Sequence, residues 1–157
     1  MEMTDFGSMN AVHIVSEAQA GSSRASELFS SARAANPWRR LWAAITRRPN
    51  ALRTLAQDHP NGRNGHYAGR RSVRLNDIRG SEGRAKDFDD QFYPLSDRTR
   101  QRWQSVASAL DEGVALPPVQ LIQVGEAYYV RDGHHRVSVN RVLGQEEIEA
   151  EVTVWEP

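Results

Sequence analysis

Residues 119–143 read VQLIQVGEAYYVRDGHHRVSVNRVL, and this stretch decides the fold. It opens with two apolar runs, VQLIQV and AYYVRD, which are rich in β-branched and aromatic residues and are joined by Gly125 and Glu126. A glycine-first pair between two such runs predicts a β-hairpin with a two-residue turn. The second run passes through Gly133 into a helical pattern from about His134 to Leu143, with Gly144 in the position of a helix C-cap. The stretch therefore predicts a hairpin that leads through one glycine into a helix.

The flanking segments complete a small α+β domain. Four apolar residues before the hairpin recur at the i, i+3, i+4, i+7 spacing of one helical stripe: Trp103, Val106, Ala107 and Leu110. Ser96 or Asp97 can cap this helix, and Gly113 can end it. Further strands are predicted in residues 72–78, with Val73 and Leu75 on one face, and in the alternating residues 148–154. This order favours helices packed on a mostly antiparallel or mixed sheet.

Charge divides the chain into two parts, although the formal net charge is zero. Residues 1–71 contain 10 Arg and 5 acidic residues, whereas residues 72–157 contain 10 basic and 15 acidic residues. We expect a disordered tail over residues 1–23, which are rich in Ser, Ala, Gly and Met and have no sustained periodicity. Residues 24–71 are predicted to form a basic helical arm and linker, and residues 72–157 to form the α+β domain.

The arm is predicted to contain two short helices and a linker. Asn36 and Pro37 can begin a helix that ends at Pro49, and four apolar residues share one of its faces: Trp38, Leu41, Trp42 and Ile45. Asn50 can cap a second helix containing Leu52 and Leu55, and residues 59–69, HPNGRNGHYAG, have the composition of a turn-rich linker. Trp38 and Trp42 favour docking on the domain or on a protein partner, and the neighbouring arginines make nucleic acid an alternative partner.

Composition excludes several classes of site. The chain has no cysteine, so disulfides, thiolate zinc sites and cysteine nucleophiles are absent. No apolar run approaches the roughly 20 residues of a membrane helix, and the N-terminus lacks the pattern of a signal peptide. We therefore expect a soluble cytoplasmic protein without a membrane partner.

The segment from Asp132 through Gly133, His134 and His135 to Arg136 has the most chemistry. A helix N-terminus presents unpaired N–H groups, glycine lets a ligand approach the backbone, and Arg and His add donors, so the pattern predicts a phosphate-sized anion site. The structural alternative is that Asp132 caps the helix, the histidines face solvent and Arg136 pairs with a carboxylate. Adjacent helical residues point about 100° apart, so the two histidines are poorly placed to share a metal ion, and no metal ligand is assigned.

A resemblance sharpens this prediction. VRDGHHRVSVNRVLG, residues 130–144, followed by IEAEV, residues 148–152, resembles the signature of the ParB/sulfiredoxin superfamily. LNDIRGSEGRAKDF, residues 75–88, resembles that superfamily's first strand and following loop, which places Arg84 at a second phosphate-facing position. The resemblance implies a nucleotide-binding fold that holds ATP, ADP or CTP with Mg²⁺. Sulfiredoxins carry a cysteine in this turn where the present chain has histidine, so their cysteine chemistry is not expected.

Two classes of function follow from the resemblance. Free-serine kinases are similar at the motif, so one is a small-molecule phosphotransferase or nucleotide hydrolase, with Glu82 or Asp87 as the carboxylate near the acceptor hydroxyl. The other is a non-catalytic nucleotide-dependent binding module that contacts DNA or a protein partner. The acidic group of Asp87, Asp89 and Asp90 is predicted to be a solvated loop face rather than a metal site.

Overall fold

The predicted hairpin lies at the centre of a six-stranded mixed sheet. The computed structural model describes residues 8–34, 52–60 and 65–156, with side chains from residue 21 onward. The strands are β1 (Arg53–Thr54), β2 (Gly65–Arg74), β3 (Ile78–Ser81), β4 (Val119–Val124), β5 (Ala127–Asp132) and β6 (Glu147–Trp155), in the order β1-β3-β5-β4-β6-β2. The helices are α1 (Ser8–Ala34), α3 (Leu55–Asp58), α4 (Arg100–Asp111) and α5 (His134–Val142), with 3-10 turns η1 (Leu75–Asp77) and η2 (Asp97–Thr99). The fold is of the α+β class with a mixed sheet, as predicted.

The turn residues and the strand side chains of the hairpin both favour its formation. β4 and β5 pair antiparallel with Val124 opposite Ala127, and Gly125 takes the φ of 59° that a tight turn requires. The β3 strand joins β5 in parallel, and β6 joins β4 in parallel, so the hairpin holds the two central positions. Along β6, Ala150 and Val152 are fully buried, which confirms the predicted alternation.

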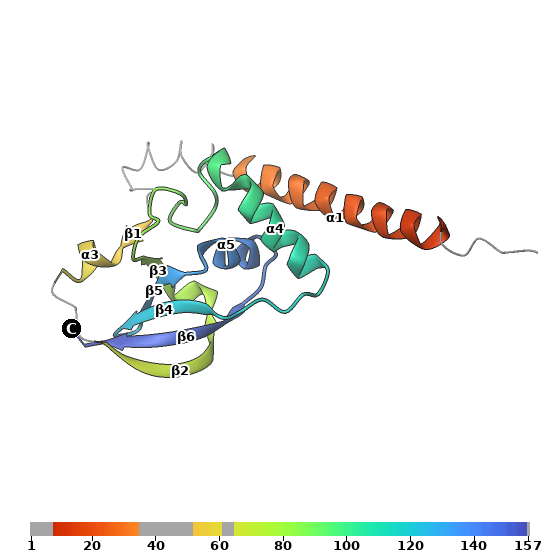
Figure 1. The fold of residues 1–157 in the computed structure, drawn as a ribbon. Helices are drawn as coiled ribbons and strands as arrows, with labels where there is room; N and C mark the ends of the chain where they lie inside the picture. The colour runs from red at the N-terminus through yellow and green to blue at the C-terminus, as the bar shows by residue number, and fades with distance from the viewer. Residues whose placement is uncertain (1–7, 35–51, 61–64, 157) are drawn as a thin grey trace, which may run out of the picture.

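Helices α4 and α5 lie on one side of the sheet, and α1 packs outside them against α4 (Figure 1). The predicted stripe of α4 faces the core: Trp103 is fully buried, and Ala107 is nearly so. The indole Nε1 of Trp103 donates a hydrogen bond of 2.8 Å to the Ser138 hydroxyl on α5. This bond joins the two helices inside the core, where an unpaired indole N–H would be costly.

Helix α1 covers residues 8–23 of the segment 1–23 that was predicted to be a disordered tail, and it continues into the predicted arm. Its C-terminal half places Ala25, Phe29 and Ala32 on one buried face, at i, i+4 and i+7. The Phe29 ring meets the Trp103 ring edge-on, with centroids 5.5 Å apart. The sequence did not indicate a helix over residues 24–34 because two of its three buried residues are alanines, which give little apolar contrast in a segment that is rich in Ala and Ser. Residues 1–7 lie outside the described ranges.

The start of the domain also differs from the prediction. Strand β2 begins at Gly65, so the segment predicted as a linker becomes a strand in its second part, and the boundary at Ser72 lies inside that strand. Gly69, at a φ of 92°, marks an extra residue where the register with β6 shifts between Tyr67 and Arg70. The glycines that suggested a turn-rich linker therefore include one that makes a β-bulge.

The predicted arm helices are only partly within the described residues. The helix carrying Trp38 and Trp42 lies outside them, so its docking on a protein or on nucleic acid stays a prediction. The second helix begins later than predicted, as α3, because Thr54 rather than Asn50 caps it: the Thr54 hydroxyl accepts from the backbone N–H of Gln57, whose side chain accepts from the backbone N–H of Thr54. None of the helices described here combines the length and the apolar character that a membrane span needs.

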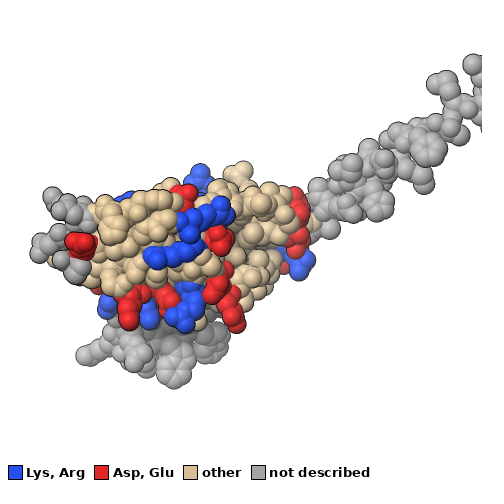
Figure 2. Space-filling view, turned by 90° about the horizontal axis from the view of Figure 1, so that it is seen from below, with Lys and Arg blue, Asp and Glu red and all other residues tan. Residues whose placement is uncertain are grey.

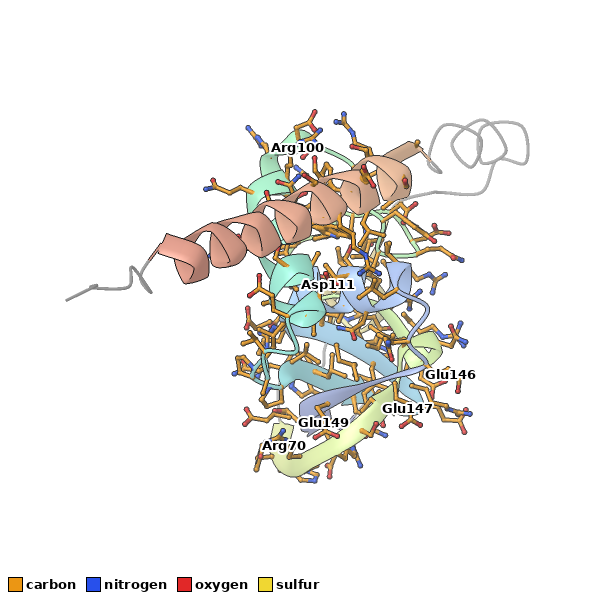
Figure 3. All side chains as sticks on the ribbon, turned by 90° about the vertical axis from the view of Figure 1, so that its right-hand side faces the viewer. Arg70, Arg100, Asp111, Glu146, Glu147 and Glu149 are labelled. Carbon is orange, nitrogen blue, oxygen red and sulfur yellow. The ribbon has the colours of Figure 1, made fainter. Side chains whose placement is uncertain are left out.

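Ion pairs join the basic and acidic parts of the chain. Arg70 on β2 contacts Glu149 on β6 at 3.1 Å (Figure 3). Arg24 on α1 contacts Asp111 at the end of α4 at 2.7 Å. On the face of the molecule shown in Figure 2, positive and negative side chains alternate along the lower part rather than separating into patches. Within the described residues, arginines of the basic part are therefore paired with carboxylates of the acidic part.

Candidate functional site: a basic cavity at the start of α5

Gly133 determines how β5 passes into α5. It has a φ of 94°, and a Cβ added there would lie 2.6 Å from the Val119 Cγ1 atom. Any other residue would therefore meet both an unfavourable backbone conformation and a steric clash. The glycine directs the first turn of α5, beginning at His134, toward an open cavity.

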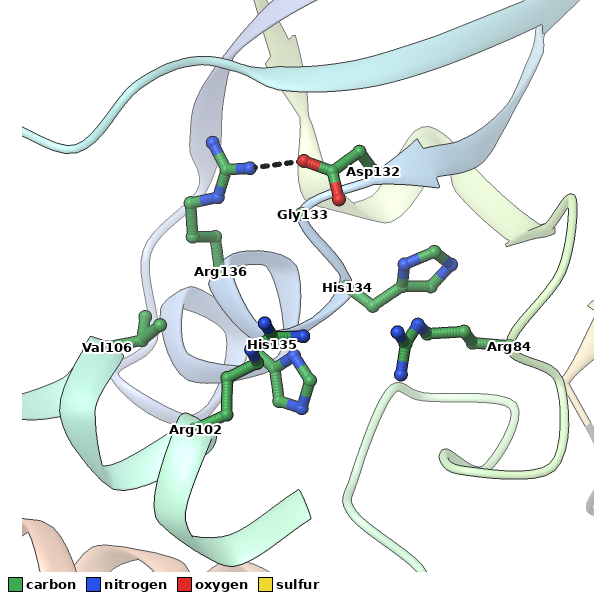
Figure 4. A pocket seen from close by; sticks show the side chains of 8 residues that line it. All are labelled: Arg84, Arg102, Val106, Asp132, Gly133, His134, His135 and Arg136. Carbon is green, nitrogen blue, oxygen red and sulfur yellow. Dashed lines mark hydrogen bonds and ion pairs between the residues drawn. The ribbon is translucent and has the colours of Figure 1, made fainter. Parts of the chain in front are cut away.

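The cavity has a volume of about 270 Å³ and lies around this first turn (Figure 4). All the residues predicted to contact phosphate line it: Arg84, Asp132, Gly133, His134, His135 and Arg136. Two residues of α4 that were not predicted complete the lining, Arg102 and Val106. The structure thus brings the two sequence segments 75–88 and 130–144 to one place and adds a third element to them.

His134 is buried and held as a hydrogen-bond acceptor. Its Nε2 atom lies 2.6 Å from the Ser81 hydroxyl oxygen, which itself accepts the backbone N–H groups of Gly83 and Arg84 at 3.1 and 3.0 Å. Because the hydroxyl oxygen already accepts two bonds, its proton is directed to His134 Nε2. His134 is therefore neutral, with its own proton on Nδ1.

His135 is also buried, with 8% of its surface exposed, so the structural alternative in which the histidines face solvent does not hold. Its ring meets the Phe88 ring edge-on at a centroid distance of 5.4 Å. The Nε2 atom of His135 is buried and has no hydrogen-bond partner among the described residues. A buried nitrogen without a partner is costly, and a ligand oxygen would satisfy it.

The two histidines of the cavity, His134 and His135, carry no charge at neutral pH. Burial, together with the nearby Arg84 guanidinium, lowers the pKa of His134 from 6.5 to about 4. Burial, together with the Arg102 and Arg84 guanidiniums, lowers the pKa of His135 to about 4 as well. The positive charge of the cavity therefore comes from its arginines.

These pKa values predict a loss of stability in mild acid. Because the folded pKa of about 4 lies below the ordinary 6.5, the unfolded chain takes up these protons first as the pH falls. The folded state therefore keeps its full stability from these two neutral histidines above about pH 6.5 and loses it as the pH falls toward 4. Urea unfolding at pH 7.5, 6 and 5 should show a falling free energy of unfolding, with a shallower fall in His135→Gln. Equal stability at pH 7.5 and 5 would contradict the assigned charge states.

Arg136 is occupied by contacts within the protein. Its guanidinium donates to the carbonyl oxygens of Pro117 and Pro118 and pairs with Asp132 at 2.8 Å. In Figure 4 its side chain extends toward Asp132, away from Arg84 and Arg102. The ion pair expected in the structural alternative is thus present, whereas Asp132 makes no side-chain cap on α5. Arg136 anchors the turn to the segment before β4.

Arg84 and Arg102 are the cations that face the cavity. Arg84 extends from the loop after β3 and has a single weak ion pair among the described residues, with Asp87 at 3.4 Å. Arg102 extends from α4 toward His135, and no ion pair is found for it within the described part of the chain. The sequence offered one signal for Arg102: its i, i+4 spacing from Arg98 marks a basic face beside the apolar stripe.

The two carboxylates predicted as catalytic lie in different places. Glu82 pairs with Arg131 at 3.0 Å and does not line this cavity. A second cavity adjoins the first and shares Arg84, Arg102 and His135 with it, and Glu82 does not line that cavity either. Asp87 lines the adjoining cavity. Of the two, only Asp87 is placed to approach a ligand.

The acidic segment around Asp87 is not wholly solvated, which corrects the prediction for Asp89. That residue is fully buried, and its Oδ1 atom accepts the backbone N–H groups of Gln91 and Tyr93 at 2.9 and 2.8 Å. The turn needs an acceptor for these N–H groups, so the carboxylate is used internally. Across the described residues, no group of three His, Asp or Glu side chains has the arrangement of a metal site.

Comparisons with known proteins give one similar structure. No family model matches the chain, and no curated protein matches it. The crystal structure of sulfiredoxin from Arabidopsis thaliana is similar at 18% sequence identity and a TM-score of 0.43, over 55% of this chain and 86% of that chain. Its name is shared with the superfamily that the sequence resembles, and membership of this chain in that superfamily stays a prediction.

Proposed function

We propose that this domain binds the phosphate groups of a nucleoside di- or triphosphate in the cavity at the start of α5. The observation that carries the proposal is the convergence of Arg84, Arg102 and His135 on that cavity. Among the described residues, the buried Nε2 atom of His135 has no hydrogen-bond partner. The backbone N–H groups of the first α5 turn add a positive dipole at the same point. Each of these groups is complementary to an anion with several acceptor oxygens.

Charge supports an anion over a neutral ligand. Arg136 and Asp132 balance each other, and both histidines are neutral, so Arg84 and Arg102 supply the net charge of the cavity. In a partly enclosed site, a charge-assisted hydrogen bond is about twice as strong as a neutral one. A ligand oxygen that reaches the His135 ring would give Nε2 the hydrogen-bond partner that the described residues do not offer.

Magnesium would arrive on the nucleotide phosphates. When bound, Mg²⁺ neutralises phosphate charge and orients the phosphate oxygens. Asp132 lines the cavity and is the carboxylate suited to act as an outer ligand. The donor set of arginines, histidines and backbone N–H groups fits the phosphates rather than a metal held by the protein alone.

Titration calorimetry with MgATP, MgADP and MgCTP tests the site through Arg102→Gln. A charged hydrogen bond contributes about 1.5 to 3 kcal/mol, so the substitution should weaken binding by roughly 10- to 150-fold. Arg70→Gln is the matched control, because it removes the same charge from the edge strand β2, away from the cavity. Equal effects of the two substitutions would mean that general charge, not this cavity, binds the nucleotide.

Turnover separates the two classes of function. A phosphotransferase or hydrolase should convert labelled ATP or CTP, with or without free serine, and Asp87→Asn should abolish turnover while leaving nucleotide binding intact. Saturable binding without turnover is the result expected of a binding module. The placement of Asp87 at the adjoining cavity favours the enzyme.

A further inference from the structure

Ser81 joins the two segments that build the phosphate cavity. It is the last residue of β3, it is fully buried, and its hydroxyl group makes hydrogen bonds to both segments. The hydroxyl oxygen accepts the backbone N–H groups of Gly83 and Arg84. The hydroxyl proton is donated to His134 Nε2 at 2.6 Å. One side chain therefore holds both the loop that carries Arg84 and the first turn of α5.

A serine hydroxyl beside a histidine also suggests a nucleophile and its base, but the surroundings of Ser81 argue against that role. None of its surface is exposed, so a substrate does not reach the oxygen unless the core rearranges. Both lone pairs of the oxygen are already used by backbone N–H groups. Ser81 also lines neither of the two cavities. Its effect on a ligand must therefore act through the residues that it holds.

Arg84 depends on Ser81 because few other contacts fix it. Its side chain is about half exposed and has one weak ion pair within the described residues, with Asp87 at 3.4 Å. A Cβ added at the preceding Gly83 would have no atom within 4 Å, so packing does not hold the loop at that point. In Figure 4 the Arg84 side chain reaches from this loop toward the first turn of α5. The hydrogen bond of 3.0 Å from the Arg84 N–H to Ser81 therefore sets where this cation lies.

The other anchors of the loop lie on either side of Arg84. The Glu82 N–H donates to a β5 carbonyl oxygen at 2.9 Å, and farther along the loop the buried Phe88 ring stacks on the His134 ring. We propose that Ser81 is the positioning residue of the phosphate site, and that its hydroxyl fixes Arg84 relative to the N-terminus of α5. This inference rests on the proposed function, and it names a residue that controls the affinity of the site without contacting the ligand.

A double-mutant cycle between Ser81 and Arg84 tests the proposal, by titration calorimetry of the full chain with inorganic phosphate at one ionic strength. Arg84→Gln should weaken phosphate binding by about tenfold or more, the loss of one charged hydrogen bond. Ser81→Ala should weaken binding by a similar factor in the native chain. In the Arg84→Gln variant it should weaken binding by less than about twofold, because the guanidinium that Ser81 positions is already absent.

Amide hydrogen exchange gives a second readout of the same variant. In Ser81→Ala, exchange should become faster at Gly83 and Arg84, whose N–H groups lose their acceptor. It should stay unchanged at Glu82, whose N–H group keeps its partner on β5. Faster exchange at all three residues would indicate a general loss of stability and would contradict a positioning role.

The matched control is Ser138→Ala, which removes another fully buried serine hydroxyl, one that accepts from Trp103 and lines neither cavity. Its effect on phosphate binding should be the same with and without Arg84→Gln. Additive losses from Ser81→Ala and Arg84→Gln, or undiminished binding by Arg84→Gln, would overturn the inference and leave the proposed function standing. Absence of phosphate binding by the native chain would overturn both.

Thermal melts followed by circular dichroism establish that each variant is folded before it is titrated. If Ser81→Ala does not fold, Ser81→Cys takes its place, because the thiol fills the space of the hydroxyl but accepts hydrogen bonds only weakly. The same dependence on Arg84 is then expected. If neither variant folds, Ser81 serves the core as a whole rather than the loop, and the proposal is wrong.

Discussion

Replacing Phe29 with alanine is expected to destabilise the protein by about 3 to 5 kcal/mol, the cost of truncating a fully buried aromatic residue. Phe29 is completely buried, its ring packs edge-on against Trp103, and the Arg100 guanidinium lies over it at 4.6 Å. Urea unfolding followed by circular dichroism measures the loss.

The control for Phe29→Ala is Val114→Ala. Val114 is 49% exposed, so its truncation should change the free energy of unfolding by less than about 0.5 kcal/mol. The comparison also tests where the folded unit begins. If Phe29→Ala were as mild as Val114→Ala, α1 would be an independent appendage, and the boundary predicted at Ser72 would regain its support.

Gly133→Ala is expected to cost about 2 to 5 kcal/mol and to weaken phosphate binding. The left-handed backbone accounts for roughly 1 to 2 kcal/mol of this loss, and the contact of the new Cβ with Val119 for about 1 to 3. Any shift that relieves the contact moves the first turn of α5, which carries His134 and His135. Denaturant unfolding and phosphate titration of the same protein samples measure both effects.

Gly144→Ala separates the two parts of that loss. Gly144 has a φ of 72°, but a Cβ there would have no atom within 4 Å, so only the backbone cost of about 1 to 2 kcal/mol is expected. Phosphate binding should be unchanged, because Gly144 lies at the far end of α5. Equal losses of stability in the two variants would show that the Val119 contact is relieved without cost.

The elements that the sequence predicted correctly are those formed by neighbours along the chain. The β4–β5 hairpin depends on Gly125 and on the two runs beside it, and α5 begins and ends at the glycines that mark it. By contrast, β3 is four residues long and contains Gly80, which suggests a break rather than a strand. Gly80 is needed there because a Cβ would lie 2.5 Å from the Arg53 carbonyl oxygen on β1. That close approach is visible only when both strands are in place.

By itself, the sequence determined the fold class, the order of the central elements and the strand-to-helix turn at Gly133, because turn geometry and side-chain alternation act over a few residues. Only the tertiary structure decided which cations face the cavity: Arg136 is held by the Pro118 carbonyl oxygen, while α4 brings Arg102 to the cavity. It also decided the charge of the histidines. Their pKa values depend on burial beneath packed elements, and burial is a property of the whole fold rather than of any local segment.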